Sequence, residues 1–185
     1  MKTTLREAQI AIQIAIGCLF AFATVGKLLN PKEFTKGVAA YGIIPSLFVP
    51  PIAILVILAE GCVATGHLTG YLFRSCIRMG ILLTGCFVIA VSINLVRGRT
   101  PKCHCFGSHG DVISLQTLMR LLLIGFGEIF LYFRSPPVYP FQLTVQDLVA
   151  GLPVAVVLSV IAVWVLSFND LLNLFWPYKY RRSER

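Results

Sequence analysis

The chain has 185 residues, of which 57% are hydrophobic and 13% charged, and its mean hydropathy is +0.81. Globular proteins are about 45–50% apolar and 25% charged, so this composition excludes an ordinary soluble domain and indicates lipid as the solvent. The net charge of +8 does not indicate a nucleic-acid partner, because the basic residues form short clusters between apolar runs. A nucleic-acid-binding protein would instead gather them on one face.

Five segments contain enough apolar residues to cross a bilayer, which takes roughly 20 residues. They lie at about residues 10–29, 47–65, 77–96, 115–133 and 145–168. The first is longer than the apolar run of a signal peptide, about 7–15 residues, so we expect it to remain as a helix. The sequence therefore predicts an all-α membrane protein, with residues 1–185 forming a single transmembrane domain.

Two cysteines lie in the most polar connection of the chain, between the third and fourth segments, where the sequence reads Arg-Thr-Pro-Lys-Cys-His-Cys-Phe-Gly. A thiolate is the nucleophile in disulfide exchange, and nearby cations stabilise it. A disulfide between residues two apart would close a small, strained ring, which is typical of labile, redox-active bonds. We expect Cys103 and Cys105 to be the catalytic pair. The residues expected to support thiol activation are Arg97, Arg99, Lys102 and His104.

Two other interpretations of this connection stay open. The cysteines could be an incidental or permanent pair. Alternatively, Cys103, His104, Cys105 and His109 offer nitrogen and sulfur ligands that zinc or Cu(I) accepts. Three adjacent side chains are too cramped to bind one ion easily, so we assign no metal site.

Several elements of the chain resemble one family. Residues 94–107, with their Cys-x-Cys-Phe-Gly element, resemble the hallmark of the MauE/DoxX family of redox-associated membrane proteins, and of the methylamine utilisation proteins MauE within it. The upstream elements that also resemble the family are Gly26-Lys27-Leu28, Pro31, Phe34, Tyr41-Gly42 and Glu60-Gly61. The resemblance covers most of the chain through the fourth segment.

The resemblance implies a four-helix DoxX-like transmembrane bundle, here with a fifth transmembrane helix, in the bacterial inner (cytoplasmic) membrane. It also implies a role in maturing methylamine dehydrogenase, whose small subunit is rich in disulfides, together with a thioredoxin-like partner of the MauD type. We expect a thiol–disulfide oxidoreductase or an accessory to one. The alternatives are a non-enzymatic scaffold for that partner and a metal-handling membrane protein. The direction of electron flow is not encoded, and an oxidase would need an acceptor such as a quinone.

Membrane topology is ambiguous in the sequence. With five spans, the side that bears the cysteine connection carries ten Lys and Arg residues and the other side carries five. The positive-inside rule therefore favours a cytoplasmic connection. The implied client is periplasmic, however, and three of the ten charges lie beside the cysteines, where they would tune the thiols. We expect the connection to face the periplasm.

Ionisable residues within membrane spans are costly and usually face other helices or a polar pathway. The candidates here are Lys27, Glu60, Arg120 and Glu128. From the rise per residue we expect Glu60 and Glu128 to share one level of the bundle, where Arg74 and Arg78 could neutralise them. We expect His67 to be interfacial. A thiol relay through the membrane cysteines is geometrically allowed, but buried cysteines most often act as small apolar side chains. These cysteines are Cys18, Cys62 and Cys86.

Overall fold

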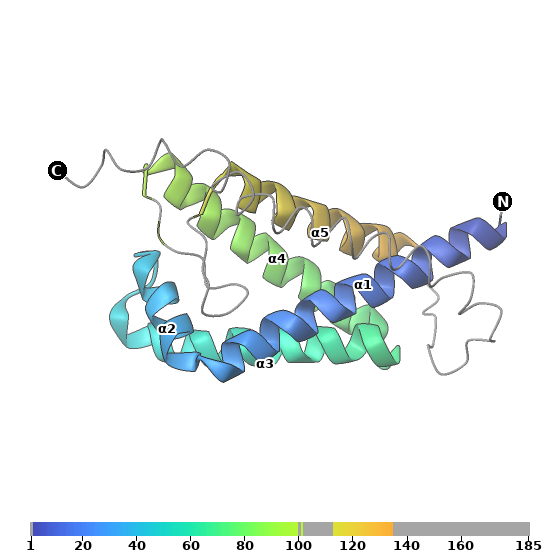
Figure 1. Cartoon of the computed structure of the whole chain (residues 1–185), viewed down its shortest axis with the longest axis horizontal. Coiled ribbons are helices and arrows are strands. Elements are labelled where there is room, and N and C mark those ends of the chain that lie inside the picture. Colours follow the sequence, from blue (N-terminus) through green and yellow to red (C-terminus); the bar gives the residue numbers. More distant parts are fainter. Residues whose placement is uncertain (1, 100, 102–112, 135–185) are drawn as a thin grey trace, which may run out of the picture.

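The computed structural model describes residues 2–99, 101 and 113–134, with side chains from Ala8 onward (Figure 1). This part of the chain is helical and contains no strand. Its elements, in chain order, are α1 (Lys2–Leu29), α2 (Pro31–Ala40), the 3₁₀ helix η1 (Ser46–Phe48), α3 (Val49–Thr69), α4 (Phe73–Val96) and α5 (Leu115–Phe133). The expected all-α class is confirmed.

Four of these helices are long and apolar enough to cross a membrane. The candidate spans are Ala8–Leu29, Ser46–Thr69, Phe73–Val96 and Leu115–Phe133. They correspond to the first four segments expected from the sequence. The fifth, at about residues 145–168, lies outside the described residues. The short helix α2, between the first two spans, was not expected.

Local sequence signals explain where the helices begin and end. Proline lies in the first turn of both α2 and α3, where its missing N–H costs no hydrogen bond. Gly70 ends α3 in the left-handed conformation, with φ 76°, which a residue without a Cβ adopts easily. At the start of α5, the Ser114 hydroxyl accepts a hydrogen bond from the Thr117 N–H, and the Thr117 hydroxyl accepts one from the Ser114 N–H.

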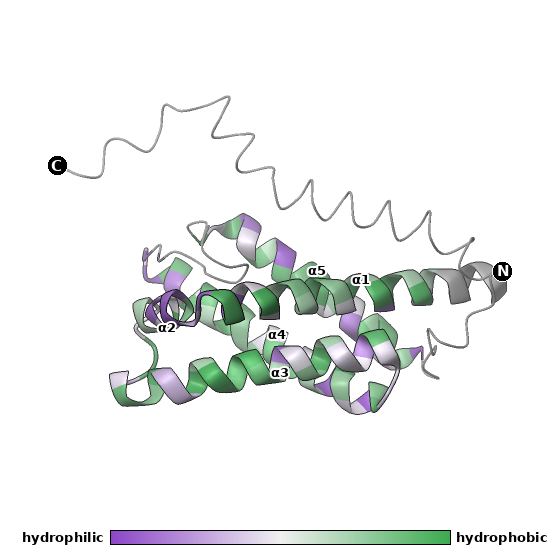
Figure 2. Ribbon diagram, turned by 60° about the horizontal axis from the view of Figure 1, so that its bottom comes forward, coloured by the Kyte–Doolittle hydropathy of each residue, from purple (hydrophilic) through white to green (hydrophobic). Residues whose placement is uncertain are grey.

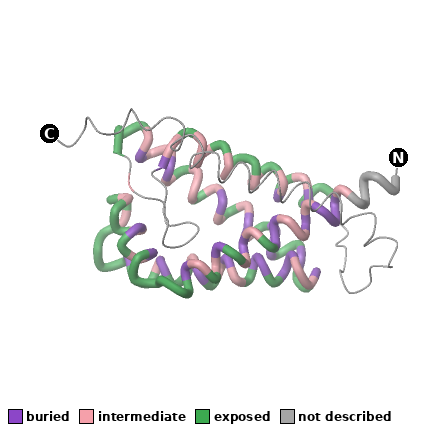
Figure 3. The backbone as a smooth tube through the Cα atoms, in the orientation of Figure 1, coloured by how far each residue is buried: buried purple, intermediate pink, exposed green. Residues whose placement is uncertain are grey.

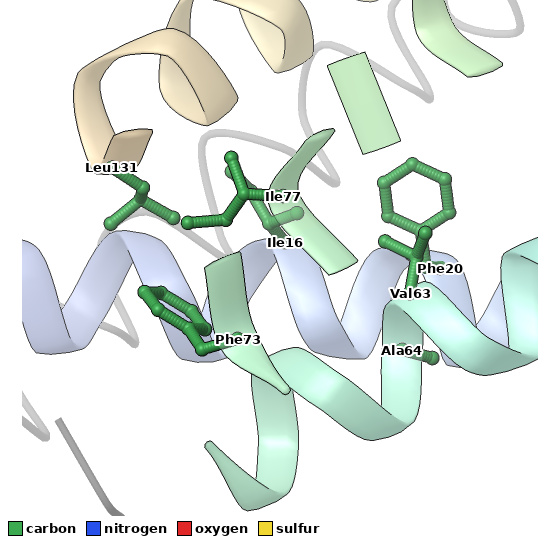
Figure 4. Packing of buried hydrophobic residues seen from close by; sticks show 7 residues of the cluster. All are labelled: Ile16, Phe20, Val63, Ala64, Phe73, Ile77 and Leu131. Atoms are coloured by element: carbon green, nitrogen blue, oxygen red, sulfur yellow. The ribbon is translucent and has the colours of Figure 1, made fainter. Parts of the chain in front are cut away.

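The four long helices close into a bundle. α1 packs against α3, α3 against α4, α4 against α5, and α5 against α1. All four contribute to one apolar cluster (Figure 4). Its buried members are Ile16, Phe20, Val63, Ala64, Phe73, Ile77 and Leu131. This closed arrangement agrees with the expected four-helix architecture.

Large apolar side chains also cover the outside of the bundle. Leu55 and Leu58 on α3, Leu82 on α4, and Leu123 and Phe126 on α5 are each more than half exposed. Exposed and buried residues alternate along the long helices (Figure 3). Both the exposed and the buried faces of these helices are largely apolar, whereas hydrophilic residues gather on α2 and at the helix ends (Figure 2). An apolar exterior of this extent is suited to lipid contact.

The described ends of the cysteine connection lie at the same end of the bundle as α2, and we call this end the loop end (Figure 1). α4 ends there at Val96 and α5 begins there at Leu115. At the opposite end, the far end, α3 turns into α4 and α5 finishes. This division places the candidate site residues described next.

Candidate functional site

A backbone hydrogen bond joins the two ends of the cysteine connection. The Ile113 N–H donates a hydrogen bond to the Pro101 carbonyl oxygen, 3.1 Å away. Ile113 is 1% exposed and packs with the buried Val91 of α4. The partly buried residues around these two are Tyr41, Leu95, Leu118 and Leu121. The segment between these ends lies outside the described residues. It contains four of the predicted site residues, namely Lys102, Cys103, His104 and Cys105. The structure thus brings the two ends of this segment together at the loop end. They pack on the apolar cluster just described, which we call the apolar base.

Burial also affects Tyr41, which belongs to this base. Its phenol lies largely out of water among the apolar residues, and this raises the pKa of Tyr41 to about 12. Tyr41 therefore stays neutral at physiological pH and packs as an apolar side chain. Gly42, which follows it, has φ +61° and so favours glycine.

Arg97 and Arg99 follow α4 directly and are both exposed. A turn with Gly98 at φ 63° lets the Arg99 N–H donate to the Asn94 carbonyl oxygen, 3.0 Å away. The Arg99 guanidinium Nη1 lies 3.1 Å from where a Cβ on Gly42 would stand. Arg99 therefore contacts the connection after α2, an arrangement that the sequence pattern did not indicate.

Asn94 is a further functional candidate that sequence reasoning named only as part of the motif. Its side chain is completely buried, and its Nδ2 donates to the Ala90 carbonyl oxygen at 3.0 Å. Its Oδ1 is buried with no hydrogen-bond partner among the described residues. A buried amide with an unsatisfied oxygen is uncommon and marks a position constrained by something other than apolar packing.

Lys27 of α1 and Glu60 of α3 form a buried ion pair. The Lys27 Nζ lies 2.8 Å and 2.7 Å from the two Glu60 carboxylate oxygens, and the side chains are only 1% and 3% exposed. The Phe34 ring of α2 lies 5.2 Å from the same ammonium, within cation–π range. Lys27 is thus an internal charge, although its place at the end of an apolar run also suggested a loop residue.

A second buried pair joins α3 to α5. The His67 Nε2 lies 3.2 Å from the Glu128 Oε2, and both side chains are fully buried. The His67 Nδ1 lies 2.9 Å from the Val63 carbonyl oxygen, and the Gln13 Nε2 of α1 donates to the His67 carbonyl oxygen at 2.8 Å. His67 lies inside the second candidate span, Ser46–Thr69, two residues before its end, and its side chain is buried in the bundle.

The predicted neutralisation of the two acids by Arg74 and Arg78 is wrong. Both arginines are exposed, and Arg78 hydrogen-bonds to the Arg74 carbonyl oxygen and to the Ser75 hydroxyl. The acids do not share a level either. Glu128 pairs with His67, which lies seven residues, about 10 Å, beyond Glu60 along α3. The rise per residue gave the position of each acid within its own helix. It gave neither the offset between neighbouring helices nor the helix face, and these decide the partner.

Arg120, the remaining intramembrane candidate, is half-buried on α5. It precedes Glu128 by eight residues, about 12 Å along the helix. Arg120 therefore lies towards the loop end.

The four described cysteines are free thiols. Cys18, Cys62 and Cys86 are exposed on the bundle surface, and Cys76 is buried against Gly66, where a Cβ would overlap the Cys76 sulfur. The described residues hold no group of three or more His, Cys, Asp and Glu side chains that could bind a metal ion.

Known proteins similar to this chain carry one name. Residues 5–133 match the family model described as methylamine utilisation protein MauE. A relative of that name from Paracoccus versutus is 31% identical over 57% of this chain and 59% of its own length, and one from Paracoccus denitrificans is 31% identical over 61% and 62%. A third, from Methylorubrum extorquens, is 30% identical over 72% and 75%. The chain thus spans about three fifths of the Paracoccus relatives. No solved structure matches it.

Proposed function

Because this chain belongs to the MauE family of methylamine utilisation proteins, we propose that it is a membrane thiol–disulfide redox protein. Its partner is a thioredoxin-like protein, and its client is methylamine dehydrogenase, whose small subunit it helps to mature through disulfide formation. Cys103 and Cys105 are the reactive pair. The family assignment itself supports a role in methylamine utilisation, and the thiol chemistry is our inference from the chain's own residues.

The observation that carries the proposal is the fastening of the cysteine connection. The Pro101–Ile113 hydrogen bond joins the ends of a segment of eleven residues, and the buried Ile113 anchors it to α4 and α5. A short, tethered connection at one end of the bundle is suited to presenting a cysteine pair to a soluble partner. Catalytic residues are often carried on loops held by a rigid scaffold.

The exchange needs both cysteines. In one direction, the thiolate of Cys103 or Cys105 attacks the partner's disulfide, forms a mixed disulfide and releases one partner thiolate. The other cysteine then attacks the mixed disulfide, closes the Cys103–Cys105 bond and frees the reduced partner. The same steps in reverse oxidise the partner. The reduced pair would then pass two electrons and two protons to an acceptor such as a quinone.

The basic residues close to the two cysteines in the sequence would help this exchange by favouring the thiolate form of a cysteine. Arg97 and Arg99 follow α4 directly, and Lys102 and His104 are the immediate neighbours of Cys103 in the sequence. A cation close to a thiol favours its deprotonated form, which is the reactive one.

The buried ion pair weakens the argument for a cytoplasmic connection. Lys27 is paired with Glu60 inside the bundle, so it does not act as a loop charge. Without Lys27 and the three thiol-tuning residues, the count becomes six basic residues against five. This near balance removes most of the charge-based objection to our proposal that the connection faces the periplasm from a multi-pass position in the inner membrane.

Thiol trapping in cells tests the proposal. One of the two variants Cys103→Ser and Cys105→Ser, the one that lacks the resolving cysteine, should accumulate a mixed disulfide between its remaining cysteine and the thioredoxin-like partner, and deleting the partner should remove it. Both Cys103→Ser and Cys105→Ser should abolish dehydrogenase maturation while the protein still inserts. The matched control is Cys86→Ser, which changes an exposed thiol within α4. Normal maturation in both loop variants would exclude thiol chemistry and leave a scaffold as the role.

A further inference from the structure

The second buried pair has an unusual hydrogen-bond arrangement. The Val63 carbonyl oxygen can only accept a hydrogen bond, so the His67 Nδ1 carries a proton and donates it. A hydrogen bond between the His67 Nε2 and the Glu128 Oε2 then requires one further proton, held on either atom. The pair therefore holds one shared proton, whether it is an imidazolium with a carboxylate or an imidazole with a carboxylic acid.

The other carboxyl oxygen of Glu128 is unpartnered. Glu128 is fully buried, and its Oε1 has no hydrogen-bond partner among the described residues. This oxygen points at Gly80 of α4, where a Cβ would overlap it. A pair with only a structural role would be expected to satisfy both oxygens, because an unsatisfied buried carboxyl oxygen costs stability.

We propose that the His67–Glu128 pair is a proton-exchange site, in which the Glu128 Oε1 binds one proton from water at the far end of the bundle. On uptake, the proton forms an O–H bond on Oε1, and the shared proton is then held by the His67 Nε2, moving there from Oε2 if it was on the carboxyl group. The product is a neutral carboxylic acid beside an imidazolium, and release reverses the step. The site goes beyond the thiol chemistry and does not depend on it.

Its position favours exchange with water. Glu128 lies five residues, about 8 Å, before the end of α5, and His67 lies two residues, about 3 Å, before the end of α3. Both helices finish at the far end, away from the cysteine connection (Figure 1). Ionisable residues within membrane spans commonly mark proton pathways.

The groups around the pair leave Glu128 as the proton acceptor. α1 brings the neutral amide of Gln13, and α4 brings the Cys76 thiol, which interacts electrostatically with Glu128. On α3, Glu60 lies two turns away and is paired with Lys27 of α1. On α5, the charged neighbour Arg120 lies two turns away. Arg74 and Arg78 on α4 are exposed.

Infrared difference spectroscopy of the purified full chain, recorded between mildly acidic and mildly alkaline pH, tests the site. We expect a carboxylic acid C=O band that appears on acidification and shifts in D₂O. Glu128→Gln should remove this band, whereas Glu33→Gln, which changes an exposed glutamate, should retain it. The absence of a pH-dependent carboxyl band from the unchanged protein would overturn the proposal, and so would its persistence in Glu128→Gln.

Two further variants keep the test decisive if Glu128→Gln does not fold. Gly80→Ala retains every titratable group but places a methyl group where Oε1 lies, so it should shift or abolish the band. Gly85→Ala, on the same helix with no atom within 4 Å of its added Cβ, should leave the band unchanged. Identical spectra for Gly80→Ala and Gly85→Ala would also overturn the proposal.

Discussion

Replacing Lys27 by methionine should destabilise the bundle strongly. Methionine keeps the unbranched, apolar stem of lysine but lacks the ammonium group, whose nitrogen lies 2.7 and 2.8 Å from the Glu60 oxygens. Glu60, only 3% exposed in its side chain, would then be a buried acid without its cation. Breaking a buried pair in this way costs about 3–5 kcal/mol. The same change removes the cation–π contact with Phe34, which acts in the same direction.

The chain contains a matched control in a second lysine–glutamate pair. The Lys36 Nζ lies 2.8 Å from the Glu33 Oε1, nearly the same distance, but these side chains are 73% and 49% exposed. An exposed pair of this kind is worth about 0.5 kcal/mol or less. Lys36→Met should therefore have little effect, although it removes the same charge.

The assay is thermal unfolding of the purified chain in detergent, followed by the loss of the monodisperse peak in size-exclusion chromatography. For a chain of this size, 1 kcal/mol shifts Tm by about 2–4 °C. Lys27→Met should lower Tm by about 6–20 °C, and Lys36→Met by about 2 °C or less. The double variant Lys27→Met, Glu60→Leu should recover most of the loss, because apolar residues can replace a buried pair. Equal shifts for the two lysine variants would refute the reasoning, as would a double variant no more stable than Lys27→Met.

Three further outcomes are expected. Gly66→Ala should lower Tm clearly because its Cβ would overlap Cys76, while Gly85→Ala should not; equal Tm values would contradict the packing. Arg97→Gln combined with Arg99→Gln should move alkylation of the reduced cysteine pair to higher pH, because fewer cations favour the thiolate; an unchanged pH profile would return both arginines to the topology count. A membrane-impermeant thiol reagent should label the reduced pair in intact cells, whereas labelling only after lysis would place it in the cytoplasm.

Several features of the protein follow from local properties of the sequence, namely its membrane spans, its cysteine connection and its internal acidic residues. A span depends on the summed hydrophobicity of about 20 consecutive residues, so four helices could be located without any knowledge of their neighbours. The cysteine connection was identified in the same way, since its polarity and its Cys-x-Cys element are contiguous. The internal position of Glu60 and Glu128 also followed from sequence alone, because each interrupts an apolar run.

Only the tertiary structure decided which internal groups meet. Lys27 and Glu60 are 33 residues apart, and His67 and Glu128 are 61 apart, so no local pattern links them. Lipid-facing and helix-facing sides are both apolar, and the hydrophobic periodicity that usually reveals the inner face is therefore weak. Position within one helix could be counted from the rise per residue, but the offset between neighbouring helices and the rotation of each helix about its axis could not. Rotation is set by how the four helices pack, and it turns Lys27 and His67 inward while leaving Arg74 exposed.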